Sequence, residues 1–263
     1  MKIMSKDESD NMFSMERQQK IEELIRKYTS VQVNELATQF NVSESTIRRD
    51  LQEMEANDLL VRTHGGAMEV SRLNYEMSFR EKEIENIKDK QKIGEIAAAM
   101  IQDGDTIILD SGTTTLEIAK RITAKSITVI TNSIDIALEI SNKDNIELIV
   151  AGGSLRHTTR AMVGPLTENV LKNFRVDKAF IGVNGISIKD GFTTPNFLEA
   201  QIKKTIIQVA KKGIIVADKS KFNKVCFSMI GELKDISSII TSDGLGKEVL
   251  IKFKELGVDI ITH

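Results

Sequence analysis

Residues 33–67 contain the pattern that most restricts how this chain can fold: two short amphipathic helices joined by a tight turn and followed by a hairpin. Apolar side chains recur at i, i+3, i+4, i+7 over residues 33–40, and a second helical repeat runs from residue 47 to 54. Between them we expect Val42 to pack in the space where the two helices meet and the Ser43 hydroxyl to cap the next helix. Two such helices share a core, so the pattern predicts a helix-turn-helix.

The second predicted helix turns a polar face to solvent, because its apolar residues Ile47 and Leu51 must face the core. An exposed arginine pair on a helix is usually only a solvated surface. A pair on the exposed face of the second of two helices joined by a tight turn instead favours insertion into the DNA major groove. The donors on this face that suit phosphates and base edges are Ser45, Thr46, Arg48, Arg49 and Gln52.

A hairpin follows the second helix. Residues 60–62 are predicted to form a strand, Gly65 and Gly66 a turn, and residues 67–70 the returning strand. Such a hairpin is the wing of a winged helix, and it adds side chains that could reach DNA. The predicted DNA-contacting residues are Ser43, Ser45, Thr46, Arg48, Arg49, Gln52, Arg62 and His64.

The charge of this region does not by itself indicate nucleic-acid binding. Residues 1–70 hold nine Lys and Arg against thirteen Asp and Glu, and the whole chain has a net charge of −2. DNA affinity must therefore come from a local cluster of Arg48, Arg49 and Arg62, with Lys20 as a further candidate. We expect dimerisation to double this cluster.

Length and composition predict two domains, since 263 residues with 41% hydrophobic content can form one small and one medium core. The single cysteine, Cys226, excludes an intramolecular disulfide, and its apolar neighbours predict a packed core thiol. No apolar run approaches the ~18 residues that span a bilayer, and the polar first residues do not form a secretory signal. We therefore expect a cytoplasmic protein without a membrane partner. The three histidines are scattered, and we expect neither a metal site nor a cofactor.

The chain divides by composition into four segments. We expect a disordered leader over residues 1–14, a winged helix-turn-helix over 15–70, a polar linker and connecting helix over 71–92, and an α/β domain over 93–263. In the linker, Glu76 and Arg80 have the i, i+4 spacing of a surface ion pair. Beyond residue 105, short β-branched runs alternate with amphipathic stretches, which indicates a mostly parallel α/β sheet.

A hydroxyl-rich loop follows the first predicted strand of the α/β domain. Residues 106–110 are followed by Ser111, Gly112 and three threonines, and then by a helical pattern over residues 116–122. Serine and threonine before a helix are more often only a cap. A loop whose N–H groups and helix dipole point at the same place can also hold an anion, and phosphate is the natural guest.

Other predicted strands also end in polar residues or glycine. The glycines among them could be a simple turn and the lysine a surface lysine, but strand carboxyl ends are where open α/β sheets bind ligands. Together they favour a site for a small polyhydroxylated anion. These strand ends are Thr131 and Asn132, Gly152 and Gly153, Asn184 and Gly185, and Asp218 and Lys219.

Residues 15–222 resemble the DeoR family of bacterial sugar-responsive repressors. The resemblance is carried by ERQQKI, STIRRDL, RTHGGA, DSGTTT, TNS, AGG, GVNGI and ADKSKF, in that order along the chain. It implies a winged helix joined to an effector domain similar in fold to ribose-5-phosphate isomerase. It also implies operator DNA and a phosphorylated sugar as partners, assembly into a homodimer or homotetramer, and repression of genes for carbohydrate uptake or catabolism.

Carried onto this sequence, the resemblance implies effector contacts at the DSGTTT loop and at the other strand ends. We expect specificity among sugar phosphates to depend on nearby loop side chains. The implied contacts are Asp110, Ser111, Gly112, Thr113, Thr114, Asn132, Gly152, Gly153 and Lys219. The loop side chains are Arg156, His157, Arg160, Thr193 and Phe197.

Two other functions fit parts of the sequence. A sugar-phosphate isomerase needs a positioned carboxylate base, which the resemblance would place within residues 182–186, where Asn184 cannot serve. Glu199, with Lys203 and Lys204, could be a remnant of a catalytic group, although such a helical charge run is usually solvated. We therefore expect no enzymatic activity and no catalytic residues. A second domain that only mediates assembly would not need polar groups at so many strand ends.

Overall fold

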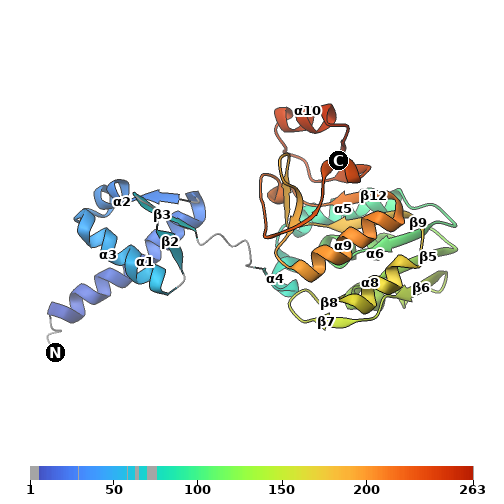
Figure 1. The fold of residues 1–263 in the computed structure, drawn as a ribbon, viewed down its shortest axis with the longest axis horizontal. Coiled ribbons are helices and arrows are strands. Elements are labelled where there is room, and N and C mark those ends of the chain that lie inside the picture. Colours follow the sequence, from blue (N-terminus) through green and yellow to red (C-terminus); the bar gives the residue numbers. More distant parts are fainter. Residues whose placement is uncertain (1–5, 29, 58, 63–64, 70–75, 263) are drawn as a thin grey trace. The chain divides into compact units, whose positions relative to one another are not determined.

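The structure is a computed structural model that describes residues 6–28, 30–57, 59–62, 65–69 and 76–262. It contains two compact units, residues 1–72 and 73–263 (Figure 1). No helix in the described part of the chain is long and apolar enough to cross a membrane.

The first unit is a winged helix-turn-helix. It contains α1 (Lys6–Tyr28), β1 (Ser30–Gln32), α2 (Val33–Phe40), α3 (Glu44–Ala56), β2 (Leu60–Arg62) and β3 (Gly66–Glu69), and its strands form an antiparallel sheet in the order β1-β3-β2. The apolar faces of α2 and α3 are buried as predicted, and Val42 packs against them. The Ser43 hydroxyl accepts a hydrogen bond from the Thr46 N–H at 3.2 Å, so the predicted helix cap is present.

Three features of this unit differ from the prediction. Helix α1 begins at Lys6, within the expected disordered leader, and no glycine or proline interrupts residues 1–28. Strand β1 was not predicted because three residues beside a helix give no periodic signal. The returning wing strand begins one residue early, at Gly66, where a Cβ atom would overlap the carbonyl of Val31 in the neighbouring strand.

The second unit is built on a seven-stranded parallel sheet, which confirms the predicted α/β class. The order of the strands is β15-β14-β12-β9-β4-β5-β6, and every pair is parallel. The last of them in the chain, β15, was not predicted. The strands are β4 (Thr106–Leu109), β5 (Ile127–Thr131), β6 (Ile146–Val150), β9 (Val176–Gly182), β12 (Ala210–Val216), β14 (Ser238–Ile240) and β15 (Asp259–Ile261).

Helices cover both faces of this sheet, and each face has its own apolar cluster (Figure 1). One layer consists of α4 (Phe79–Ile84), α5 (Ile87–Ala99), α6 (Thr113–Arg121) and α7 (Ile134–Ile140). The other consists of α8 (Pro165–Lys172), α9 (Phe197–Val209) and α10 (Lys247–Glu255). Helices α5 and α6 approach closely at Gly94, where a Cβ atom would lie 2.8 Å from the carbonyl of Glu117.

Short elements that the sequence did not predict follow the carboxyl ends of three strands. A hairpin of β7 (Ser154–Arg156) and β8 (Ala161–Val163) follows β6. A small antiparallel sheet of β10 (Gly185–Ser187), β11 (Gly191–Thr194) and β13 (Ser228–Gly231) begins after β9. A 3₁₀ turn, η1 (Lys219–Lys221), follows β12, and a second, η2 (Leu233–Asp235), precedes β14. Elements of three or four residues are too short to show a period.

The environment of Cys226 corrects the sequence interpretation. The thiol is free and half-buried, and its neighbours Val225 and Phe227 are exposed instead of packed in the core. The backbone N–H of Cys226 donates to the side-chain hydroxyl of Thr193 at 2.9 Å, so this segment lies against a side chain of β11. Apolar neighbours in the sequence therefore did not indicate a core position for Cys226.

Candidate functional site

The loop between β4 and α6 forms one wall of a pocket in the second unit. Four of the residues predicted to contact an effector, Ser111, Gly112, Thr113 and Thr114, line this pocket together. Its empty space is about 630 Å³, including the mouth that is open to solvent. The first N–H groups of α6 are not bonded within the helix, so this wall offers donors and a positive dipole end to an anion.

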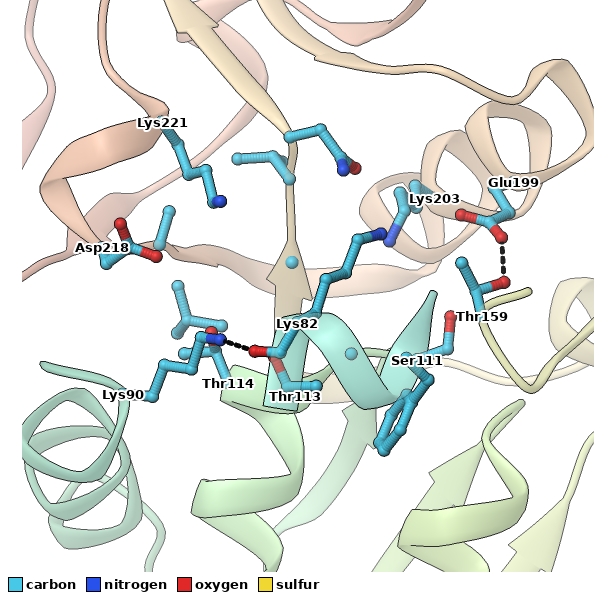
Figure 2. Close-up of a pocket in the computed structure, with 17 residues that line it drawn as sticks. Lys82, Lys90, Ser111, Thr113, Thr114, Thr159, Glu199, Lys203, Asp218 and Lys221 are labelled. Atoms are coloured by element: carbon cyan, nitrogen blue, oxygen red, sulfur yellow. Dashed lines mark hydrogen bonds between the residues drawn. The ribbon is translucent and has the colours of Figure 1, made fainter. Parts of the chain in front are cut away.

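Four lysines from four different elements also line the pocket (Figure 2). Lys82 belongs to α4, Lys90 to α5, Lys203 to α9 and Lys221 to η1. Only two carboxylates, Glu199 and Asp218, line it with them. Three of the lysines also pair with carboxylates that do not line the pocket: Lys82 with Glu76 at 2.9 Å, Lys221 with Glu85 at 3.6 Å, and Lys203 with Asp110.

Lys90 is the most unusual of these lysines because it is only 3% exposed. Its ammonium group donates to the backbone carbonyl of Lys82, and it forms no ion pair with a carboxylate of the described residues. Burial lowers the pKa of Lys90, although the nearby charge of Asp218 acts in the opposite direction. A buried cation without a carboxylate partner is costly, and an anion in the pocket would stabilise it.

Two predicted contact residues lie behind the loop and hold its shape. Asp110 is fully buried, forms an ion pair with Lys203, and accepts a hydrogen bond from the Gly182 N–H at 3.1 Å. Burial raises the pKa of Asp110, and the charge of Lys203 opposes this shift. Asn132 accepts a hydrogen bond from the Ser111 N–H at 3.1 Å and donates to the carbonyl of Met162 at 3.1 Å.

Besides Asp110 and Asn132, three further predicted contact residues do not line the pocket. The Gly152 carbonyl accepts a hydrogen bond from the Thr167 hydroxyl, and a Cβ atom at Gly153 would overlap that same threonine, so both glycines lie against the chain near α8. Lys219 lies beside Gly244. Lys221, two residues later, reaches the pocket instead, because a 3₁₀ turn points positions two apart in different directions.

The sequence interpretation missed several lining residues, and for one of them a signal was present. Lys90 lies on the same face of α5 as the buried residues Ile93 and Ala97, at helical spacing. A lysine on an otherwise apolar helix face is a sign of a functional charge. Asn184 and Asp218, named above as polar strand ends, line the pocket, and the lining residues that the sequence did not indicate as part of a ligand site are Phe79, Lys82, Lys90, Thr159, Gly182, Val183, Glu199, Lys203, Val216, Ala217 and Lys221.

Residues of the β7–β8 hairpin bond to the segment around the start of α4, which lies next to the pocket. The predicted Glu76–Arg80 pair is wrong, because Glu76 precedes α4 and instead pairs with Lys82 at 2.9 Å and with Arg156. The Phe79 N–H donates to the Thr158 carbonyl at 2.7 Å. None of the five expected specificity residues lines the pocket directly, but Arg156 bonds to Glu199, which does.

Helix α3 in the first unit exposes the predicted recognition residues. The side chains of Arg48 and Arg49 are 55% and 83% exposed, and they form helical ion pairs with Glu44 at 3.2 Å and Glu53 at 3.3 Å. Exposed ion pairs of this kind contribute little free energy to stability, so each arginine could leave its carboxylate for a DNA phosphate at a small free-energy cost.

The other predicted DNA-contacting residues differ in their surroundings. Ser45 and Gln52 are exposed and Thr46 is half-buried, while the Ser43 hydroxyl is engaged in the helix cap. Arg62 pairs with Glu55 at 2.7 Å. His64 lies outside the described residues. Asp50 is the buried acid of α3, and it bonds to Arg17 of α1, which holds α3 against α1.

The described residues contain no group of three or more His, Cys, Asp or Glu side chains arranged to hold a metal ion.

Comparison with known proteins gives matches to both units. The profile described as the DeoR-like helix-turn-helix domain matches residues 17–72, and that of the DeoR C terminal sensor domain matches residues 85–243. The uncharacterized HTH-type transcriptional regulator YulB of Bacillus subtilis is 41% identical over 89% of this chain and 91% of its own length. The HTH-type transcriptional repressor GlcR of Bacillus subtilis is 35% identical over 94% of this chain and 100% of its own length.

Among solved structures, ribose 5-phosphate isomerase A from Methanocaldococcus jannaschii is similar over 52% of this chain and 55% of that chain. The identity is 18% and the TM-score is 0.38, a similarity too low to carry an argument about activity.

Proposed function

The chain belongs to the DeoR family of DNA-binding transcriptional regulators, and on that premise we propose that it represses genes of carbohydrate uptake or catabolism until a phosphorylated sugar fills its pocket. The observation that carries this proposal is the charge of the pocket. A helix N-terminus and a hydroxyl-rich loop converge beside Lys90, whose buried ammonium group lacks a carboxylate partner among the described residues. A phosphate dianion supplies the missing charge, and the remaining polar groups suit sugar hydroxyls.

On the DNA side, α3 would enter the major groove with Arg48 and Arg49 toward phosphates and base edges. One winged helix offers few cations, and the acidic balance of its surroundings weakens non-specific attraction. We therefore propose that a homodimer or homotetramer places two winged helices on two operator half-sites. Each copy then contributes its own pair of arginines.

Effector control would work as a population shift between two arrangements of the assembled chains. Phe79 and Lys82 line the pocket, and they follow the boundary between the units closely in sequence. A ligand that touches these residues acts on the first helix after the linker. It changes DNA affinity only if it binds the two arrangements unequally, and we propose release from DNA as the outcome.

We propose no catalytic role for the pocket. The proposal follows the relatives, which are transcriptional regulators, because the pocket itself does contain a carboxylate, Glu199, while the amide of Asn184 cannot accept a proton. Aldose to ketose conversion of a phosphorylated sugar that binds this protein would contradict this part of the proposal.

A thermal-shift panel tests ligand recognition directly. We expect at least one phosphorylated pentose or hexose to raise the unfolding midpoint by roughly 5 °C or more at about 100 times its Kd, because a ligand bound only by the folded state stabilises it. The same sugar without its phosphate should leave the midpoint unchanged. A broad panel of sugar phosphates without any shift would refute the assignment of the pocket.

A further inference from the structure

Glu199 is a buried carboxylate in the wall of the pocket. It lies in the first turn of α9, is 4% exposed, and lines the cavity. Figure 2 shows Glu199 and Thr159 on one side of the pocket, with Lys90 and Lys221 on the opposite side. The Glu199 carboxylate is therefore separated from Lys90 and Lys221, whereas Lys203 lies beside it and Asp218 lies on the side of Lys221.

Only one oxygen of this carboxylate is satisfied by the protein. Oε1 accepts hydrogen bonds from the Thr159 hydroxyl and from the Arg156 guanidinium, the latter at 3.0 Å. Oε2 has no hydrogen-bond partner among the described residues, and it points toward the interior of the pocket (Figure 2). A carboxylate oxygen in the wall of a pocket that lacks a protein donor can accept a hydrogen bond from a ligand that brings one.

The cations near Glu199 are already in use. Arg156 is shared with Glu76, and Lys203, one turn further along α9, forms an ion pair with the buried Asp110. Neither is free to neutralise a second anionic group at this end of the pocket. Because Arg156 already pairs with both Glu199 and Glu76, a carboxylate on the ligand would be a third anion beside one guanidinium group, whereas a hydroxyl group would donate to Glu199.

We propose that Glu199 accepts a hydrogen bond from a hydroxyl group at the end of the ligand remote from its phosphate. The site therefore binds polyol phosphates in preference to sugar-acid phosphates of the same carbon chain. This inference rests on the proposed function, since it assigns the phosphate to the lysine side. Thr159 and Arg156 are positioning residues for the Glu199 carboxylate. Selectivity then comes from a repulsive element as well as from an attractive one.

Two pairs of probes differ only at the relevant end. Sorbitol 6-phosphate and 6-phosphogluconate, and ribitol 5-phosphate and 5-phosphoribonate, exchange a terminal CH₂OH for a carboxylate. We expect the wild-type protein to bind the polyol phosphate of at least one pair about 10-fold or more tightly than its acid partner, measured by calorimetry at neutral pH. Equal or tighter binding of the acid by the wild-type protein would overturn the proposal.

Glu199→Gln removes the charge and keeps the shape of the side chain. We expect it to lose most of the preference for the polyol while its thermal shift with inorganic phosphate stays unchanged. Glu255→Gln, an exposed change at the end of α10, should keep the preference. A preference that persists in Glu199→Gln would overturn the proposal. If this variant does not fold, the wild-type ratio alone decides. If the wild-type protein binds none of the four probes and does not bind inorganic phosphate, both the proposed function and this inference are overturned.

Discussion

Replacing Arg48 and Arg49 together by alanine is expected to weaken operator binding by about 100-fold, because each arginine that contacts DNA contributes roughly 1–3 kcal/mol. Both side chains are exposed on α3 and are held only by surface ion pairs. Neither contributes to the core formed by Ile47, Leu51 and Met54, so the unit should remain folded. The measurement is fluorescence anisotropy with a duplex that the wild-type protein selects from a random pool, at two salt concentrations.

The matched control is Arg175→Ala, which removes one exposed charge from the second unit. It should leave DNA affinity unchanged. If the two arginines contact phosphates, the slope of log affinity against log salt should become shallower by roughly two. A double variant that keeps both the affinity and the salt dependence of the wild type would show that α3 is not the DNA-reading helix.

The second large effect is expected at Lys90. Lys90→Met keeps the length and apolar stem of the side chain but removes the buried charge, and it should weaken binding of the phosphorylated sugar by about 10- to 100-fold. DNA binding without the ligand should be unaffected. Lys92→Met, on the exposed face of the same helix, is the control. Calorimetry with the sugar found in the thermal-shift panel measures both, and equal affinities for the two variants would contradict the assignment of Lys90.

Lys90→Met weakens ligand binding, but it is expected to raise the free energy of unfolding of the protein without ligand. Because burial lowers the pKa of Lys90, the unfolded chain binds more protons than the folded chain between that lowered pKa and the ordinary value of 10.5. Below this window both states carry the proton, and the folded state bears the full cost of the buried cation. Lys90→Met should therefore be more stable than the wild type at neutral pH, and its advantage should shrink as the pH rises toward 10.5. Urea unfolding at several pH values measures this difference.

The sequence predicted best those features that are local. Helices α2 and α3 and the Ser43 cap depend on spacing within a dozen residues, and the structure confirms them. The loop residues 111–114 are contiguous, so their convergence at the start of α6 could also be predicted. The three-residue strand β1 could not, because its pairing with β3 depends on contacts over more than thirty residues.

The rest of the pocket depends on the order of strands in the sheet. Lys82, Lys90, Lys203 and Lys221 are spread along the sequence, and they meet because β4 lies beside β9 and β9 beside β12. No local pattern specifies that order. The choice between Lys219 and Lys221 depends on a single turn, η1, which was not predicted.

The most direct test of a metabolite-controlled repressor is ligand-dependent release of DNA by the full chain. The protein is bound to its selected duplex, and the phosphorylated sugar with the largest thermal shift is added while anisotropy is recorded. We predict that the wild-type complex dissociates over the concentration range in which the sugar binds, that the unphosphorylated sugar has no effect, and that Lys90→Met stays bound. A sugar that binds the wild-type protein yet leaves its DNA affinity unchanged would contradict the account.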